Sequence, residues 1–219
     1  MATALITGGN RGIGLELIRQ MMDRGDTMIV ACRKSSPDLD ATGAQVIENI
    51  EVSDPDSLAT LATKLSGRRL DLLINCAGIL TRESLDDLGL ERIRRQFEVN
   101  ALGPLCVTSA LLNNLGQGAK VAIITSRMGS MEDNTSGGMY GYRMSKAAVN
   151  MVGCSLSHDL RERGITVILL HPGMVATEMT GHKGISPRES AQGLIARMDE
   201  SGMERSGSFL HANGKQLPW

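Results

Sequence analysis

The chain has 219 residues, a formal net charge of −1 and 42% hydrophobic residues, which suits a protein with a sizeable buried core. This charge balance gives no reason to expect nucleic acid or an anionic membrane as a partner, and no apolar run is long enough to span a bilayer. The four cysteines lie in or beside apolar segments without a C-x-x-C pair, the four histidines lack ligand spacing, and the first residues lack a basic leader. We therefore expect a cytoplasmic protein with reduced thiols and no metal site.

Apolar runs rich in Val, Ile and Leu alternate with helical patterns along the whole chain. In the first part of the chain we expect a strand over 2–7, a helix over about 12–23, a strand over 27–32, a connection over 33–43 with room only for a stunted helix, and a strand over 45–50. A helix that begins at Asp54 and Pro55 follows, then a strand over 70–75 and a helix over about 90–115 with a bend near Gly103 and Pro104. The last expected elements are a strand over 120–125, a helix over about 139–163, a strand over 165–170, a helix that begins at Ser186 and a strand over 208–211.

Strands that read as continuous apolar runs are buried on both faces, and crossover helices between them make neighbouring strands parallel. The pattern predicts an α/β fold, a Rossmann-type doubly wound parallel sheet of about seven strands with helices on both faces. No repeat, low-complexity segment or linker divides the chain, so we expect residues 1–219 to form a single domain. Ligands of such sheets bind beyond the carboxyl ends of the strands, which makes the residues that follow strands the candidates for chemistry.

Residues 7–14, TGGNRGIG, connect the first expected strand to the first helix. Gly8 permits a tight turn, and Gly12 and Gly14 let the backbone and the helix N-terminus approach a pyrophosphate, whose charge the helix dipole stabilises. A purely structural glycine turn is the alternative. The position between a strand and a helix is the one that dinucleotide binding requires, and it favours the cofactor interpretation.

Both tyrosines of the chain lie within residues 140–146, YGYRMSK. A phenol can protonate a carbonyl oxygen that receives a hydride, but its ordinary pKa of about 10 has to be lowered by a cation. Residues four apart share a helix face, so Lys146 accompanies Tyr142, whereas Met144 accompanies Tyr140. Two unit charges about 5 Å apart at an effective dielectric of about 20 interact by roughly 3 kcal/mol, or about two pKa units. We therefore predict that Tyr142 is the proton donor; an ordinary surface pair is the alternative.

With these two motifs the chain resembles the short-chain dehydrogenase/reductase family, whose glycine signature is TGxxxGxG. Four further motifs follow in the order that the family has them: NCAG at 75–78, FEVN at 97–100, TSRMG at 125–129 and HPGMVAT at 171–177. The spacing between Ser126 and Tyr142, the run at 137–146 and the final GKQLPW are similar to the carbonyl-reductase-like branch, which includes Sniffer-type and C-factor-like proteins.

The resemblance implies catalytic roles for four residues. Tyr142 would donate the proton, Ser126 would orient the substrate carbonyl, Lys146 would bond the nicotinamide ribose, and Asn100 would hold a water chain for proton resupply. Ser130 is a rival hydroxyl further into the loop, and a structural role for Asn100 in a kinked helix stays open. The residues that the resemblance places around the cofactor are Gly8, Asn10, Arg11, Gly12, Ile13, Gly14, Arg33, Glu51, Val52, Asn75, Ala77, Gly78, Tyr142, Lys146, Pro172, Gly173, Val175 and Thr177.

The end of the second expected strand predicts which cofactor is used. Family members that use NAD carry an acid there, whereas this chain has Cys32 followed by Arg33 and Lys34. A guanidinium suits a 2′-phosphate, the missing carboxylate removes a repulsion, and Arg11 is expected to converge on the same spot. Solvated surface charges are the alternative. We expect NADP(H) in preference to NAD(H).

The leading hypothesis is an NADPH-dependent carbonyl reductase that transfers a hydride between the cofactor and a small aldehyde, ketone or quinone, or the matching alcohol. A nucleotide-binding signalling protein of C-factor-like type is the alternative, although such a protein has no need of all four catalytic residues. A sugar-nucleotide epimerase or dehydratase would need an extra substrate domain for which this chain has no room. The oligomeric state stays open, and a homodimer through the helix over 139–163 is one expectation from the family.

Overall fold

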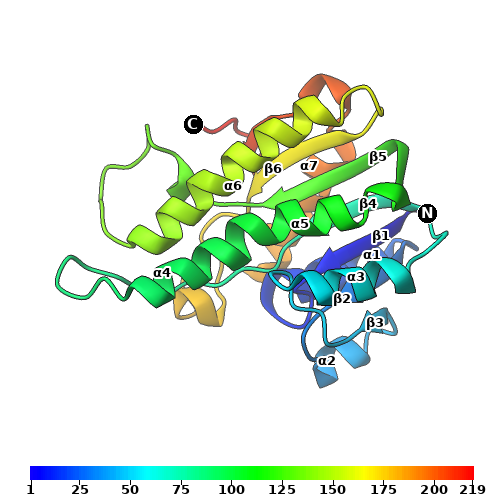
Figure 1. Ribbon diagram of the computed structural model, residues 1–219, viewed down its shortest axis with the longest axis horizontal. Helices are drawn as coiled ribbons and strands as arrows, with labels where there is room; N and C mark the ends of the chain where they lie inside the picture. The colour runs from blue at the N-terminus through cyan, green and yellow to red at the C-terminus, as the bar shows by residue number, and fades with distance from the viewer.

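A parallel sheet of seven strands forms the centre of the protein in the computed structural model, which describes residues 1–219 (Figure 1). The strand order is β3-β2-β1-β4-β5-β6-β7, and every neighbouring pair is parallel. The strands are β1 (Thr3–Thr7), β2 (Thr27–Ala31), β3 (Gln45–Ile47), β4 (Leu70–Asn75), β5 (Leu115–Ile124), β6 (Thr166–His171) and β7 (Phe209–His211). The predicted doubly wound sheet is confirmed. Its strand order reverses between β1 and β4, the place where sheets of this kind bind ligands.

Helices cover both faces of the sheet (Figure 1). They are α1 (Gly12–Asp23), α2 (Pro37–Asp40), α3 (Pro55–Lys64), α4 (Leu90–Phe97), α5 (Gly103–Ala110), α6 (Tyr140–Asp159) and α7 (Pro187–Glu200). One buried apolar cluster contains side chains of α3, α5 and α6, and the other contains side chains of α1, α2 and α7. None of the helices has both the length and the apolar character that crossing a bilayer would need.

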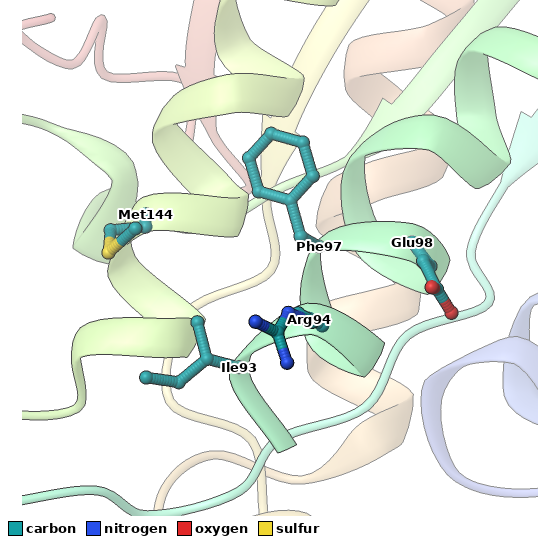
Figure 2. A pocket seen from close by; sticks show the side chains of 5 residues that line it. All are labelled: Ile93, Arg94, Phe97, Glu98 and Met144. Carbon is teal, nitrogen blue, oxygen red and sulfur yellow. The ribbon is translucent and has the colours of Figure 1, made fainter. Parts of the chain in front are cut away.

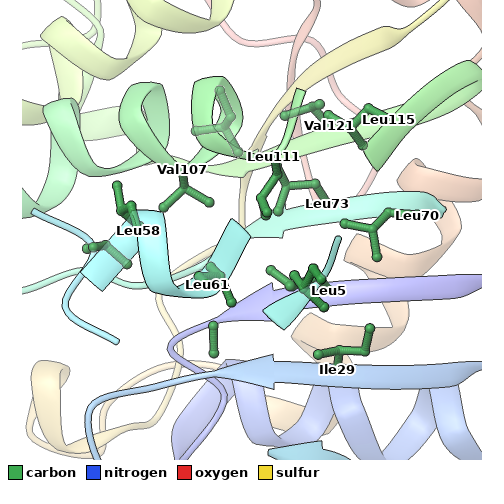
Figure 3. Packing of buried hydrophobic residues seen from close by; sticks show 14 of the residues in the cluster. Leu5, Ile29, Leu58, Leu61, Leu70, Leu73, Val107, Leu111, Leu115 and Val121 are labelled. Atoms are coloured by element: carbon green, nitrogen blue, oxygen red, sulfur yellow. The ribbon is translucent and has the colours of Figure 1, made fainter. Parts of the chain in front are cut away.

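Successive residues of the central strands alternate between these two clusters. Leu5 and Leu73 belong to the cluster beneath α3, α5 and α6, which Figure 3 shows, whereas Ile6 and Ile74 belong to the cluster beneath α1 and α7. Consecutive side chains of a strand point to opposite faces, so a strand that is covered on both faces needs an apolar residue at nearly every position. The continuous apolar runs in the sequence have this cause.

The single helix predicted over 90–115 is wrong, because the chain divides it. A turn of π-helix, Glu98–Leu102, separates α4 from α5. The irregularity therefore lies in the wider helix turn that contains Asn100. This turn comes just before the Gly103-Pro104 pair, where the sequence predicted a bend. Single π turns of this kind occur at functional sites, where they aim one side chain away from the regular helix.

The strand predicted to start at residue 120 begins five residues earlier, at Leu115. Asn114 ends the preceding helical segment, because its side-chain amide donates hydrogen bonds to the backbone carbonyls of Leu65 and Arg68, each at 2.7 Å. These bonds join positions 46 or more residues apart in sequence. They turn the chain toward β4, where Leu115 pairs with Leu70.

The other boundaries differ from the predictions by a few residues. The strand expected to reach residue 50 ends at Ile47, because Asn49 adopts a left-handed backbone with φ of 62°. The predicted stunted helix is α2, a four-residue helix whose N-cap, Ser36, accepts a hydrogen bond from the Leu39 N–H. The helix expected over 139–163 is α6, which ends at Asp159.

Candidate active site

A cavity of about 910 Å³ opens at the carboxyl edge of the sheet, beside residues that follow β1, β2 and β4. The residues that line it and that were predicted from the sequence are Gly8, Asn10, Arg11, Gly12, Ile13, Gly14, Arg33, Glu51, Val52, Ala77, Gly78, Tyr142, Lys146, Pro172 and Thr177. A shallower hollow of about 320 Å³ between α4 and α6 (Figure 2) has only Ile93, Arg94, Phe97, Glu98 and Met144 around it. The larger cavity is therefore the candidate active site.

The glycine loop forms a cradle at one end of this cavity. Gly8 has φ of +75°, and a Cβ there would lie 2.7 Å from the Cα of Ala77, while a Cβ on Gly14 would overlap the carbonyl oxygen of Gly8. Helix α1 starts after Arg11, whose side chain makes no capping hydrogen bond. The first N–H groups of α1 therefore lack side-chain partners, and Gly12, Ile13 and Gly14 line the cavity, an arrangement that fits a pyrophosphate.

The charged groups at the rim are paired differently from the prediction. Arg11 does not converge with Arg33; it forms an ion pair of 2.6 Å with Glu178, a residue of the segment after β6. The two charges are both mostly exposed, so the pair contributes little to stability. Arg33 faces Glu51 instead, with 3.8 Å between the closest charged atoms.

Tyr142 and Lys146 are both buried on the face of α6 that meets the cavity. The Lys146 Nζ lies 5.7 Å from the centre of the Tyr142 ring and donates a hydrogen bond of 3.0 Å to the Ile124 carbonyl. Burial raises the pKa of Tyr142 to about 12, and a smaller effect of the Ser126 hydroxyl opposes that rise. Burial also lowers the pKa of Lys146 to about 8, against a smaller opposing effect of Cys76.

These shifts correct one part of the sequence argument. From the sequence, we predicted that the charge of Lys146 lowers the pKa of Tyr142 toward neutrality. In the structure, the loss of water around the phenol raises the pKa of Tyr142 and outweighs the opposing effect of the Ser126 hydroxyl. Tyr142 therefore holds its proton at neutral pH, which is the form that can donate it.

Ser126 and Ser130 differ in what they contact. The Ser126 Oγ accepts a hydrogen bond of 3.1 Å from the Met128 N–H and lies beside the Tyr142 phenol. The Ser130 hydroxyl donates to the Trp219 carbonyl at 3.1 Å and accepts from the Asp133 N–H at 3.0 Å. Ser130 is thus engaged in holding its own loop, while Ser126 stands next to the predicted proton donor.

Asn100 lies in the π-helix turn and joins two elements of the site. Its Oδ1 accepts from the Ile79 N–H at 2.8 Å, and its Nδ2 donates to the Ile79 carbonyl at 2.9 Å and to the Ser145 hydroxyl at 3.0 Å. A Cβ on Gly78 would come within 3.3 Å of Asn100 Oδ1 and 3.9 Å of Lys146 Nζ. The side chain thus connects the loop after β4 to the helix of Lys146.

Three predicted cofactor residues do not line the cavity. Asn75 is 2% exposed and its amide donates to the Thr108 hydroxyl at 3.2 Å, so it joins β4 to α5. Gly173 and Val175 turn toward Ile185, in the connection that leads to α7. The neighbouring Cys76 does line the cavity, and burial raises the pKa of its thiol to about 11, which keeps it protonated and a poor nucleophile.

Several residues of the site belong to no sequence motif. Arg95, Glu178 and His182 line the cavity. Their positions depend on how α4 and the segment after β6 pack, which no local pattern in the sequence reports.

A buried acid at the start of α6 was also missed. Helix α6 follows Met139, which has φ of 51° and gives no side-chain cap. Instead, the Glu83 Oε2 accepts from the Gly141 N–H at 3.2 Å, and Gln96 donates to the Glu83 Oε1 at 3.0 Å. A Cβ on Gly141 would overlap the Gln96 amide. The glycine between the two tyrosines therefore lies in a tightly packed place, where a Cβ would also come within 3.1 Å of the Ile93 Cα.

Comparisons with known proteins agree with this geometry. A family model described as short chain dehydrogenase matches residues 2–186. The 1-hydroxy-2-glutathionyl-2-methyl-3-butene dehydrogenase of Rhodococcus sp. (strain AD45) is 45% identical over the full length of both chains. The C-signal protein of Myxococcus xanthus is 45% identical over 74% of this chain and its own full length.

Two solved structures have the same fold over the whole chain. The NADPH-bound carbonyl reductase from chicken fatty liver is 29% identical, with a TM-score of 0.91 over 100% of this chain and 99% of its own. The carbonyl reductase Sniffer of D. melanogaster is 26% identical, with a TM-score of 0.91 over 100% of both chains. The fold, the motif residues around one cavity and these matches show that the chain belongs to the short-chain dehydrogenase/reductase family of oxidoreductases and resembles its carbonyl-reductase-like members.

Proposed function

We propose that the protein is an NADPH-dependent oxidoreductase that transfers a hydride between the nicotinamide and a carbonyl or alcohol substrate. The observation that carries the proposal is the arrangement along one cavity. The glycine cradle and Arg33 lie at the nucleotide end, and Tyr142 and Lys146 line the same cavity with Ser126 beside the phenol. An oxidoreductase of this kind needs a dinucleotide site and a proton donor within reach of each other.

The preference for NADPH over NADH rests on the residues after β2. Arg33 is 69% exposed at the side chain, lines the cavity and stands where no acid follows β2. A guanidinium binds a phosphate with two parallel hydrogen bonds, whereas an acid at this place would repel it. The chicken carbonyl reductase, whose structure contains NADPH, supports the same cofactor for this chain.

The bound nicotinamide would supply or accept the hydride. Tyr142 would hold the proton at its phenol oxygen until the substrate oxygen gains negative charge, and Ser126 would keep the substrate oxygen close to that phenol. The phenolate that remains would be stabilised by Lys146, whose Nζ lies 5.7 Å from the centre of the ring. Each role is assigned to a group that is already buried and in place.

The Rhodococcus relative suggests a substrate class within this reaction. Its name describes a dehydrogenase that acts on a hydroxyl group next to a glutathionyl-bearing carbon. We propose that hydroxy conjugates of glutathione are one substrate class to test. A panel of candidate substrates therefore combines such conjugates with NADP⁺, and aldehydes, ketones, diketones and quinones with NADPH. Absorbance at the NADPH band reports both directions. Turnover of one class identifies the substrate, and no turnover of any would contradict the proposed enzyme.

The C-signal relative favours a second function, a nucleotide-binding protein whose signalling role does not need turnover. The same panel separates the two functions. Calorimetry measures whether the protein binds NADPH tightly. Tight binding without oxidation of NADPH in the presence of any substrate of the panel would support the signalling function.

We also propose that the protein forms a homodimer. Phe97 and Met144 are partly exposed on either side of the hollow between α4 and α6 (Figure 2), and Met151 lies two turns further along α6 at 67% exposure. Apolar side chains gathered in this way favour association. Light scattering coupled to gel filtration measures the mass, and Met151→Glu should shift it toward the monomer.

A further inference from the structure

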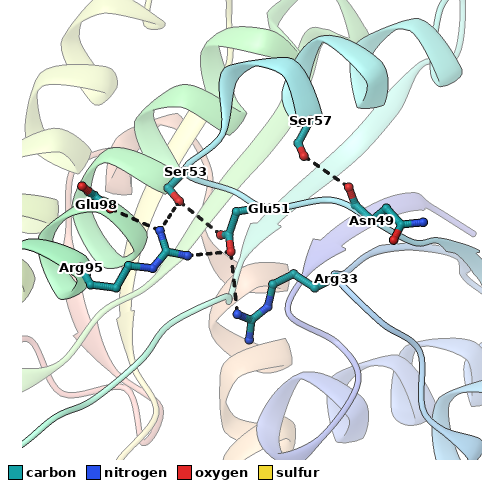
Figure 4. A network of polar contacts seen from close by, with 7 residues as sticks. All are labelled: Arg33, Asn49, Glu51, Ser53, Ser57, Arg95 and Glu98. Carbon is teal, nitrogen blue, oxygen red and sulfur yellow. Dashed lines mark hydrogen bonds and ion pairs between the residues drawn. The ribbon is translucent and has the colours of Figure 1, made fainter. Parts of the chain in front are cut away.

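Three charged side chains meet at the nucleotide end of the cavity, as Figure 4 shows. Glu51 lies between Arg33 and Arg95, and both guanidinium groups approach the same carboxylate oxygen, Oε2. The distance to Oε2 is 3.8 Å for Arg33 and 2.7 Å for Arg95. Under the proposed function, Arg33 binds a 2′-phosphate. A free carboxylate at this distance would repel that phosphate and compete with it for Arg33.

Arg95 removes this conflict through a direct contact with one oxygen of Glu51 and a contact with the other by way of Ser53. Its Nη2 binds Oε2 directly. Its Nη1 donates to the Ser53 Oγ at 2.7 Å, and the Ser53 hydroxyl donates to Oε1 of Glu51 at 3.3 Å. The carboxylate is therefore hydrogen-bonded on the Arg95 side, and Arg33 stays beyond hydrogen-bond distance with a largely exposed side chain. The planar guanidinium fork suits such a double contact, whereas an ammonium would not reproduce it.

We infer that Arg95 is a specificity-determining residue, which neutralises and holds Glu51 and so leaves Arg33 free for the 2′-phosphate of NADPH. The inference rests on the proposed cofactor preference and adds to it a residue outside every motif of the family. Arg95 acts through Glu51, since its nearest charged partners are Glu51 and Glu98, the latter at 3.3 Å.

Isothermal titration calorimetry with NADPH and NADH tests this inference without any substrate, because the two cofactors differ only by the 2′-phosphate. Arg95→Met should raise the Kd for NADPH about fivefold, which corresponds to roughly 1 kcal/mol. The Kd for NADH should change less than about twofold, a few tenths of a kcal/mol. Arg94→Met is the matched control, because Arg94 is the preceding residue of α4 and pairs with Glu91. It should leave both constants unchanged.

Removal of the competing charge should reverse the effect. The double variant Glu51→Gln with Arg95→Met has no carboxylate to occupy Arg33, so its ratio of NADH to NADPH Kd should return to the wild-type value. An Arg95→Met protein with an unchanged ratio, or with both constants raised equally, would overturn the inference. A double variant that stays impaired for NADPH would overturn it as well.

Arg33→Met separates this inference from the proposed function. If Arg33→Met abolishes the preference for NADPH and Arg95→Met does not, only the role of Arg95 fails. If the wild-type protein binds NADPH no better than NADH, the proposed cofactor preference fails and the inference fails with it. Thermal unfolding monitors the fold of each variant. Should Arg95→Met not fold, Arg95→Lys keeps the charge without the fork and is expected to lose part of the preference; an unchanged ratio there would also overturn the inference.

Discussion

At the scale of single residues, burial moves Tyr142 and Lys146 toward their uncharged forms. The phenol has a pKa of about 12 and the ammonium a pKa of about 8, so neither group behaves as it would in water. The phenol keeps its proton at neutral pH, and the lysine loses its own proton more readily than it would in water. The proposed proton donor and the cation beside it are thus both shifted by the removal of water.

The first prediction concerns the two tyrosines. Tyr142→Phe should lower kcat/KM for the substrate found in the panel by about a thousandfold, within the range that a lost general acid usually costs. The Kd for NADPH should stay nearly unchanged, because the ring remains. Tyr140→Phe is the matched control on the same helix and should have a mild effect. Steady-state kinetics and calorimetry measure both, and a Tyr142→Phe protein with its full rate would remove Tyr142 from the mechanism.

The second prediction is that Lys146→Met stabilises the protein while it removes activity. The folded pKa of Lys146, about 8, lies below the ordinary value of 10.5, so at pH 7 folding places a charge in a buried site. That cost is at most about 3 kcal/mol. As the pH rises from about 8 to 10.5, the folded wild-type protein holds fewer protons than the unfolded chain, and its stability rises toward that of the variant.

Urea unfolding at pH 7 and pH 10 checks this prediction. The variant should have the higher free energy of unfolding at pH 7, and the difference should shrink at pH 10. A variant that is less stable than wild type at both values would show that the bond from Lys146 to the Ile124 carbonyl outweighs the burial of the charge.

Sequence reasoning found the residues that belong to motifs and missed those that act across the fold. Tyr142 and Lys146 could be paired because they are one helix turn apart. Arg95 meets Glu51 across 44 positions, and Glu83 meets Gly141 across 58. Neither contact leaves a local pattern, because both depend on how α4 and the loop after β4 pack. Burial of the phenol was missed for the same reason.

At the scale of elements, the N-terminus of α6 depends on a side chain from another part of the chain. Glu83, 6% exposed, accepts from the Gly141 N–H and receives hydrogen bonds from Gln96 and from the Thr81 hydroxyl. A carboxylate near the first turn also complements the helix dipole. The loop after β4 therefore fixes the first turn of the helix that carries Tyr142.

The third prediction follows from this contact. Glu83→Ala should lower the free energy of unfolding by about 1–3 kcal/mol, because the Gly141 N–H and the Gln96 amide lose a buried acceptor. Glu132→Ala changes an exposed acid in the loop before α6 and serves as the control, with an expected effect within about 0.5 kcal/mol. Urea unfolding measures both. Equal effects of the two substitutions would contradict the capping role.

Helix and strand types were predicted well where the apolar pattern is strong, and boundaries failed where long-range bonds decide. The helix over 90–115 looks continuous in sequence, since nothing in FEVNALGP announces a π turn. The turn exists because Asn100 bonds the backbone of Ile79 in both directions. Likewise, β5 starts early because Asn114 holds two carbonyls of the connection before β4.

At the scale of the whole molecule, a buried histidine lies where the last two strands end. His171 is 6% exposed, its ring lies edge-on to that of His211 with 4.9 Å between the centres, and its Nδ1 has no hydrogen-bond partner. Burial lowers the pKa of His171 to about 3, and the charges of His211, Arg127 and Lys146 add to this effect, while Asp133 opposes it. Protonation of His171 is thus disfavoured while this edge of the sheet is folded.

The fourth prediction is that His171 makes the fold sensitive to acid. The folded pKa of about 3 lies below the ordinary 6.5, so the unfolded chain binds more protons between these values and stability falls as the pH drops from 6.5 toward 3. At pH 5 the loss amounts to about 2 kcal/mol. His171→Asn should remove this part of the acid sensitivity. Thermal unfolding at pH 5 and pH 7 for both proteins checks it; parallel losses of stability would assign the sensitivity to other groups.

The parallel arrangement of the sheet has a consequence for synthesis on the ribosome. β1 pairs with β2 on one side and with β4 on the other. Ala4 therefore lacks its partner Leu72 until β4 has been synthesised. Until β4 has left the ribosome, the nascent β3-β2-β1 unit presents an open strand edge and an apolar surface that no helix of the second half covers. We expect the N-terminal third of this chain to depend on chaperones more than the rest, since non-local parallel pairing is slow to form.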